Sequence, residues 1–200
     1  MSLTWPKDYV ISKKTFMNLR TTAVMAGILV ALGTLFLIFR RPPEPDTRTE
    51  SRTFIWSVEV EELNRLAISL PLVGRREAWV KRADRYWYFD QPDGPKVDMQ
   101  RWGGGIPLLL SGPGAERLIV AAATDKQLAS YGLQEPRMKI ELTLKNEDTI
   151  FVDIGDRTLD GQTYYIKKRD SQAVYTVDHT WYEVLERLVR EPPYPGTAKH

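Results

Sequence analysis

The chain has 200 residues, a net charge of +2 at pH 7, two histidines and no cysteine. Such an even charge balance gives no basic field of the kind that binds nucleic acid. The lack of cysteine excludes disulfides, thiolate zinc sites and thiol nucleophiles, and two histidines supply little imidazole for a metal site or for catalysis.

The first informative segment is an uncharged run over residues 21–39, bracketed by Arg20 and Arg40. A helix of this length reaches about 28 Å, close to the roughly 30 Å core of a bilayer. The run ends in Leu37, Ile38 and Phe39, where a signal peptidase requires small residues. We therefore expect an uncleaved, single-pass transmembrane helix over residues 21–39, preceded by an N-terminal arm over residues 1–20.

The charges that flank this run are nearly balanced between its two sides. The preceding basic residues are Lys7, Lys13, Lys14 and Arg20, and the following ones are Arg40, Arg41, Arg48 and Arg52. The free amino terminus favours a cytoplasmic N-terminus by the positive-inside rule. On these charges we expect the bulk of the chain outside the cytoplasm.

Two features of the N-terminal region suggest partners. Three small residues are spaced four apart: Ala23, Gly27 and Ala31. That spacing stacks them on one side of a helix, where a second membrane helix can approach closely. Three aromatic residues of the arm stand among lysines: Trp5, Tyr9 and Phe16. This mixture suits the membrane interface or a groove on a partner subunit, so we expect the lipid bilayer and other membrane protein subunits as partners.

Proline-rich segments bound the rest of the chain. Pro42, Pro43 and Pro45 end the helix and predict a semi-rigid linker over residues 40–52. A proline-rich tail over residues 191–200 is expected to be a disordered end rather than a recognition motif. Residues 53–190 between them suffice for one domain with a hydrophobic core.

The first half of this domain predicts a meander followed by a helix. Strands are expected over residues 66–70, 77–81 and 86–89, with a turn at residues 82–84. Asp98 is expected to cap a helix that runs toward Leu110. A further strand is expected over residues 117–121.

The second half repeats this plan more clearly. Apolar residues alternate over residues 138–144 and 150–154, and further strands are expected over 163–167 and 173–177. A loop over residues 156–162 separates the two pairs. Thr180 and Glu183 have the spacing of a capping box, and one face of the helix that follows is apolar. The pattern predicts an α+β domain, an antiparallel sheet with helices on one face, and allows two β-meander-plus-helix units. The tryptophans of the domain are expected in the core or at an interface.

An ordered set of short motifs runs through this second half. Tyr131-Gly132-Leu133 is followed by Pro136, then by Ile154-Gly155-Asp156 and by Tyr164-Tyr165. This set resembles an uncharacterised bacterial envelope domain family, also found in auxiliary proteins of gliding-motility-type ABC transporters. The resemblance implies a chain in the bacterial inner membrane, with an outward-facing, β-rich module on the periplasmic side and no catalytic residues to carry over. The family's first helix is continuous, whereas Gly103, Gly104, Gly105 and Pro107 predict a short, kinked or missing helix here.

Several residues are candidates for a phosphate, hydrolase or calcium site. The glycines at 103–105 lack the lysine or the Gly-x-Gly-x-x-Gly spacing of a phosphate loop. They predict turns, although a partner backbone or a pigment-like ligand could approach them closely. Ser111 lacks the flanking glycines of a hydrolase elbow. Asp153, Asp156 and Asp160 do not have the spacing of a calcium loop. We expect no catalytic residue, no cofactor and no metal.

These observations favour a non-catalytic, membrane-anchored accessory or scaffold subunit of a larger membrane complex. The complex is an ABC-type transporter if the resemblance holds, or an energy-transducing photosynthetic or respiratory assembly. A second alternative is an extracytoplasmic ligand-binding sensor, which would need an apolar pocket lined by tryptophans. An enzyme would need a cleft with a strongly perturbed carboxylate.

Overall fold

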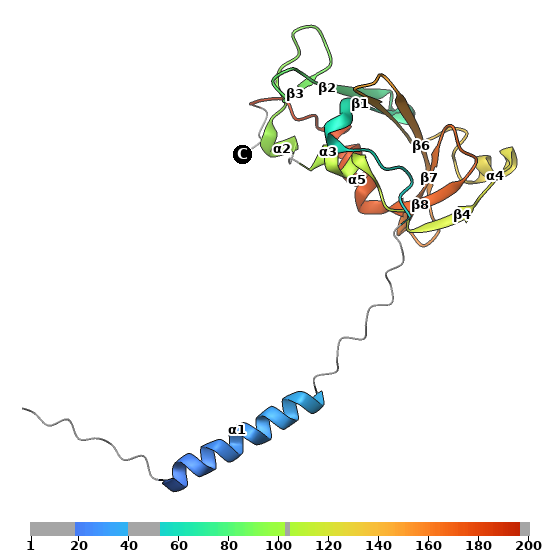
Figure 1. Ribbon diagram of the computed structural model, residues 1–200. Helices are drawn as coiled ribbons and strands as arrows, with labels where there is room; N and C mark the ends of the chain where they lie inside the picture. The colour runs from blue at the N-terminus through green and yellow to red at the C-terminus, as the bar shows by residue number, and fades with distance from the viewer. Residues whose placement is uncertain (1–18, 40–52, 103–104, 197–200) are drawn as a thin grey trace, which may run out of the picture. The chain divides into compact units, whose positions relative to one another are not determined.

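The computed structural model describes residues 19–39, 53–102 and 105–196 (Figure 1). The chain divides into two compact units, Met1–Thr49 and Glu50–His200. The first contains helix α1 (Leu19–Phe39), and the described side chains at residues 22–36 are all exposed. Over the part of the chain that the structure describes, no helix meets the length and apolarity needed to cross a membrane. The structure therefore does not support the expected transmembrane helix, and the linker over residues 40–52 lies outside the described residues.

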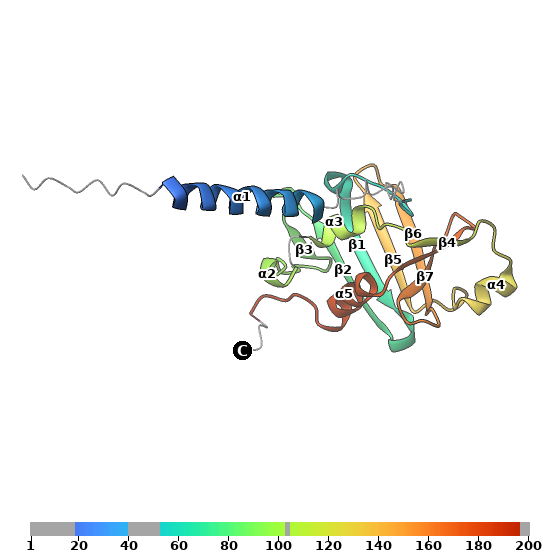
Figure 2. The same ribbon diagram turned by 90° about the horizontal axis from the view of Figure 1, so that it is seen from below.

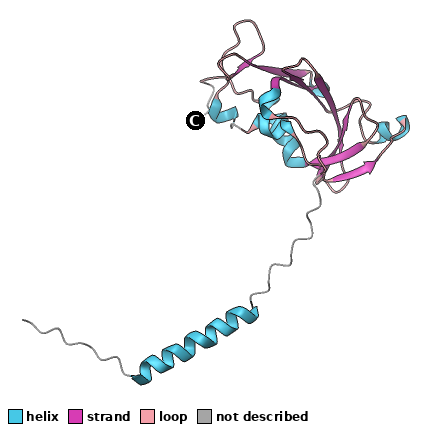
Figure 3. Ribbon diagram, in the orientation of Figure 1, coloured by secondary structure: helices cyan, strands magenta, loops and turns pink. Residues whose placement is uncertain are grey.

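The second unit is built on one eight-stranded antiparallel sheet with strand order β3-β2-β1-β5-β6-β7-β8-β4 (Figure 3). The strands are, in chain order, β1 (Leu63–Leu70), β2 (Arg75–Lys81), β3 (Trp87–Phe89), β4 (Arg117–Val120), β5 (Met138–Leu144), β6 (Thr149–Arg157), β7 (Thr163–Lys168) and β8 (Val174–Asp178). The predicted α+β class and the predicted strands are confirmed. The two suggested units share this one sheet, because β1 pairs with β5 and β4 pairs with β8 at the far edge.

Helices and 3₁₀ turns complete the domain. They are η1 (Val60–Glu62), η2 (Pro71–Val73), α2 (Met99–Trp102), α3 (Ile106–Ser111), α4 (Asp125–Ser130) and α5 (His179–Arg190). Helix α5 packs against β1, β2, β7 and β8. Helices α2 and α4 lie toward opposite ends of the sheet (Figure 2). The interrupted first helix is confirmed, because the structure has the short helices α2 and α3 in its place.

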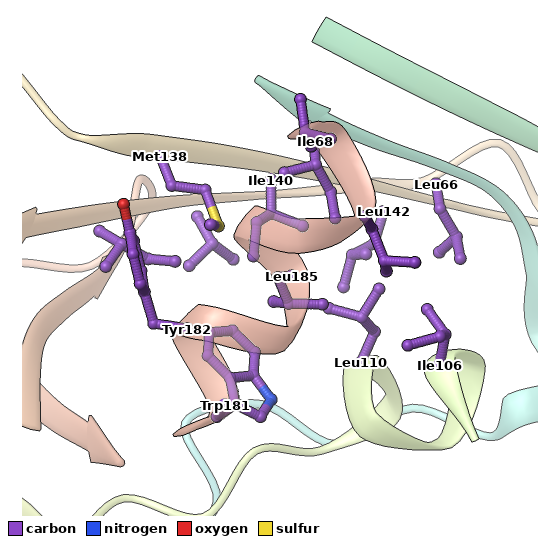
Figure 4. Packing of buried hydrophobic residues seen from close by; sticks show 14 of the residues in the cluster. Leu66, Ile68, Ile106, Leu110, Met138, Ile140, Leu142, Trp181, Tyr182 and Leu185 are labelled. Atoms are coloured by element: carbon purple, nitrogen blue, oxygen red, sulfur yellow. The ribbon is translucent and has the colours of Figure 1, made fainter. Parts of the chain in front are cut away.

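The hydrophobic core fills the space between the sheet and α5. Alternate residues of β1 and β5 point toward the helix, among them Leu66, Ile140 and Leu142 (Figure 4). Leu185 of α5 enters this layer and is fully buried. Burying one such side chain stabilises the fold by roughly 1.5–3 kcal/mol. The apolar face predicted for this helix is therefore confirmed.

An aromatic cluster extends the core beneath β2 and β3. The Trp79 and Trp102 rings lie 5.1 Å apart at an angle of 61°, and Phe89 stacks on Tyr194 at 3.9 Å. The Asp98 N–H donates to the Pro193 carbonyl at 2.8 Å. The expectation of a disordered end is thus wrong for residues 191–196. The Tyr194 ring leaves water and packs on the Phe89 ring, which holds this segment against the domain.

A strand end, a helix cap and one short helix differ from the sequence prediction. Strand β6 continues to Arg157, so it includes the first residues of the predicted loop. Helix α5 is capped by Asp178 rather than by Thr180, whose N–H donates to the Asp178 carboxylate. Helix α4 was not predicted, although Thr124 and Gln127 form a capping box at its start.

The glycine motifs of the second half meet in one contact. The Asp156 N–H donates to the Tyr131 carbonyl at 2.8 Å. A Cβ atom on Gly155 would lie 2.1 Å from that same oxygen, and Gly132 has a left-handed backbone with a φ of +67°. The Tyr131 ring packs 4.6 Å from Tyr165. The Tyr-Gly-Leu and Ile-Gly-Asp motifs therefore serve close packing between the end of α4 and strand β6.

We predict that Gly155→Ala lowers the free energy of unfolding by about 1–3 kcal/mol, because the added methyl group overlaps the Tyr131 carbonyl. Urea denaturation followed by circular dichroism measures the change. Gly114→Ala is the matched control, since a Cβ there meets no atom within 4 Å. Equal stability of the two variants would contradict the structural role given to Gly155.

Candidate functional site

A groove of about 520 Å³ lies beside the outer strand β4. Four segments form its walls: the start of the domain, the residues that lead into β4, strand β8 and the first turn of α5. Its lining residues are Thr53, Pro113, Gly114, Ala115, Glu116, Arg117, Leu118, Tyr175, Val177, Asp178 and Trp181. The lining residues come from three separate parts of the sequence, residue 53, residues 113–118 and residues 175–181, so the groove exists only in the folded chain.

Strand register decides which side chains share the groove. Leu118 pairs with Tyr175, and side chains two residues apart lie on the same face of a strand. Glu116 therefore lies on the same face as Leu118, and Val177 on the same face as Tyr175. This is the face covered by α5. Because α5 begins directly after β8 and packs over β1 and β2, it leaves this corner open.

Hydrogen bonds hold the tryptophan wall of the groove in place. The Trp181 indole N–H donates to the Leu109 carbonyl at 3.0 Å. The neighbouring Trp56 indole donates to the Leu110 carbonyl at 2.9 Å, and the two rings meet edge to face at 6.4 Å. Both carbonyls belong to α3, so this short helix fixes the orientation of the wall.

The rim of the groove carries two carboxylates, of Asp178 and Glu116, and one guanidinium, of Arg117. Asp178 caps α5, and its hydrogen bonds to the side chain and backbone of Thr180 hold its pKa below the ordinary value, so the carboxylate stays ionised. Glu116 is exposed and, among the described residues, has no ion-pair partner. The pKa of Asp160 is lowered mainly by the hydrogen bond from the Thr158 side chain, and the nearby Arg117 charge adds to this lowering.

A second recess, of about 320 Å³, lies beside β1, β2 and β3, at the opposite end of the strand order from β4. Burial raises the pKa of Glu77 there, while the nearby Arg75 charge opposes the shift. The other carboxylate of the recess, Asp90, is bound to Arg65 at 2.6 Å. A single carboxyl group with this shift does not form the paired acid and base that hydrolytic chemistry requires.

The residues expected to bind partners are only partly described. Ala23, Gly27 and Ala31 are exposed on α1, and a Cβ on Gly27 would meet no atom within 4 Å. The arm residues Trp5, Tyr9 and Phe16 lie outside the described residues, as do Gly103 and Gly104. Gly105 caps α3, and its carbonyl accepts from the Leu109 N–H at 2.7 Å. Its role in the described structure is local.

The other candidate residues have local partners. Asp153 pairs with Arg169, and Asp156 pairs with Arg137. In the described ranges, no three acidic or histidine side chains converge on a metal position. The Ser111 hydroxyl donates to the Leu108 carbonyl at 2.8 Å. The five domain tryptophans are buried, as predicted, with Trp181 also lining the groove.

Sequence reasoning missed the groove, although part of its signal was present. Tyr175 and Val177 alternate on a predicted strand, and Trp181 follows on the next helix. Glu116 and Leu118 come from a remote segment, and only strand pairing brings them alongside.

A Domain of unknown function (DUF4340) is found over residues 113–189. It begins with the residues that lead into β4 and ends within α5, so it holds nearly the whole groove. It leaves out β1, β2 and β3, although β1 pairs with β5 in the same sheet. No curated protein and no solved structure matches the chain. The resemblance to a domain family of unknown function is confirmed, and a link to gliding-motility transporters is not shown.

We predict that Asp178→Ala lowers the free energy of unfolding by about 1 kcal/mol at pH 7, because α5 loses its cap. A carboxyl group with a lowered pKa stabilises the fold above its unfolded pKa, about 3.9, and this stabilisation is lost as pH falls through the folded pKa. The difference from wild type should therefore shrink in acid. Urea denaturation at pH 7 and pH 3 measures it.

Asp170→Ala is the control for this experiment, because Asp170 lies in an exposed turn and its carboxylate, within the described ranges, pairs with Lys168 alone. We expect its effect to stay within about 0.5 kcal/mol. A loss as large as that of Asp178→Ala would argue against the helix cap as the cause.

Proposed function

We propose that this chain is a non-catalytic, membrane-attached accessory or scaffold subunit of a larger membrane complex. One observation carries the proposal: between alanine, glycine and threonine residues, α1 exposes a series of large apolar side chains over residues 22–36. They are Val24, Met25, Ile28, Leu29, Val30, Leu32, Leu35 and Phe36. A helix that is apolar on every side is stable where lipid or protein surrounds it. Each of these side chains would gain roughly 1.5–3 kcal/mol on leaving water.

The bilayer is the proposed surrounding, and a partner helix the proposed neighbour. The uncharged run over residues 21–39 supports the bilayer, since its length as a helix is close to the hydrocarbon thickness. Ala23, Gly27 and Ala31 support a partner helix. In lipid the hydrophobic effect does not drive helices together, so their association depends on close packing, which small residues allow. The domain would then be displayed outside the cytoplasm.

A ligand-binding sensor is the second candidate function, and the groove beside β4 is the observation that favours it. Its volume of about 520 Å³ lies within the range of small-molecule sites. Tyr175 and Trp181 give it aromatic walls. The two functions differ in what fills the groove, a small molecule or a segment of a partner protein.

We predict that Gly27→Leu reduces recovery of the complex severalfold, because leucine fills the stripe through which helices approach. Co-purification from membranes in a mild detergent measures it. Gly33→Leu makes the same change about 120° around α1, and a Cβ at either glycine meets no atom within 4 Å. Equal recovery for both variants would show that the stripe is background composition.

We also predict that protease added to intact spheroplasts digests the domain beyond Arg41, since the proposal places it outside the cytoplasm. Detergent-lysed cells give the fully digested reference. If digestion occurs only in inverted vesicles, the orientation is reversed, and release of the chain by carbonate washing would remove the membrane attachment itself.

A further inference from the structure

We propose that the groove beside β4 docks a partner polypeptide that presents a lysine or arginine side chain. The proposal rests on the accessory function above and names the chemistry of the partner. Three properties of the groove carry it: its apolar floor, the excess of carboxylates at its rim and its position along an open sheet edge.

The floor suits the long stem of a basic side chain. Val177 is buried, Tyr175 is half-buried and Leu118 is 49% exposed, so the exposure of the apolar side chains increases along the groove. Lysine and arginine lay their methylene groups along such apolar surfaces and keep the charged end in water. The Tyr175 and Trp181 rings add the aromatic surface that attracts a cation.

The charges of the groove select a positive end group. Glu116 lies on the same strand face as Leu118 by strand alternation, and Arg117, which carries the one positive charge among the described lining residues, lines the groove as well. Asp178 is ionised because Thr180 donates to Oδ1, while Oδ2 lies 3.8 Å from His179 Nδ1. Two carboxylates and one guanidinium therefore border the groove, and the excess negative charge favours a basic segment over an acidic one.

The position of the groove favours a polypeptide over a free amine. The edge that leads into β4 already carries an extended segment: Phe54 forms an antiparallel bridge with Gly114, and the Ala115 N–H donates to the Thr53 carbonyl at 2.8 Å. Among the described residues, no strand continues this pairing along the outer side of β4. A partner strand can form hydrogen bonds with the backbone N–H and C=O groups on the outer side of β4, whereas a small amine cannot pair along them.

The opposite edge of the sheet offers no comparable site. Residues on its outer side are bonded to β3 at both ends: the Phe89 N–H donates to the Pro95 carbonyl and the Val97 N–H to the Trp87 carbonyl, each at 3.0 Å. This cover blocks the addition of another strand. The β4 edge is therefore the one we expect a partner to use.

The test uses the full chain in detergent micelles and the peptide acetyl-Thr-Val-Arg-Val-Thr-amide. Binding is followed by the NMR shifts of the Trp181 indole and of the Leu118 and Tyr175 amides. We expect saturable shifts that weaken with salt, since exposed charge pairs are screened. Peptides with glutamate or norleucine in place of the arginine are the matched probes, and both should bind more weakly.

Glu116→Gln should weaken the arginine peptide roughly twofold to fivefold, the range for an exposed ion pair. Glu116→Lys should weaken it further by charge reversal. Glu147→Gln, at an exposed glutamate of the β5–β6 turn, is the control and should leave binding unchanged. Glu116 is exposed, so its replacement should not change the urea midpoint, and that measurement confirms that the variants fold.

Several results would overturn the proposal. Equal binding of the norleucine peptide would make the groove a purely apolar site, and equal binding of free arginine would make it a small-ligand site. Slow exchange of the β4 amides that point away from β8, before peptide is added, would show that another segment or a second copy already covers the edge. No shift with any peptide would remove the site altogether. None of these results bears on the attachment through α1, which the Gly27→Leu experiment tests separately.

Discussion

Burial of α5 against the sheet is the interaction on which the rest of the domain depends. Leu185 is fully buried between this helix and the strands, and α5 packs on β1 and β2 as well as on β7 and β8. The DUF4340 region includes α5 but none of the first three strands. Without β1, the inner edge of β5 and much of the apolar face of α5 would meet water. The first three strands are therefore part of the same folding unit in this chain.

The second constraint is the backbone contact between Tyr131 and Gly155. The register between β6 and β7 shifts between Ile154 and Arg157, so β6 bends there and the Asp156 N–H turns to the Tyr131 carbonyl. Any side chain on Gly155 would occupy the space of that carbonyl. The motifs that carry the family resemblance thus describe a packing requirement, and they give no indication of chemistry.

The groove is a consequence of how α5 leaves the sheet. The helix starts at the end of β8 and runs back over the inner strands, so the corner between β4 and β8 has no helical cover. Asp178 starts the helix and also places a carboxylate at the rim. One residue therefore serves folding and the charge of the candidate site. For the same reason Glu116, whose carboxylate has no ion-pair partner among the described residues, is the better position at which to test binding.

Sequence periodicity alone determined most of the secondary structure, because alternation over residues 138–144 and the apolar face of α5 are local consequences of strand and helix geometry. The glycine and proline content predicted the break in the first helix, since Gly103 to Gly105 and Pro107 disfavour a continuous helix. Strand order was decided by tertiary structure: nothing local shows that β4 pairs with β8 or that β1 lies beside β5. The docking of Tyr194 and the assembly of Glu116, Tyr175 and Trp181 into one groove likewise depend on contacts between distant residues. Such contacts form only when burial of a shared core offsets the entropy of bringing distant segments together.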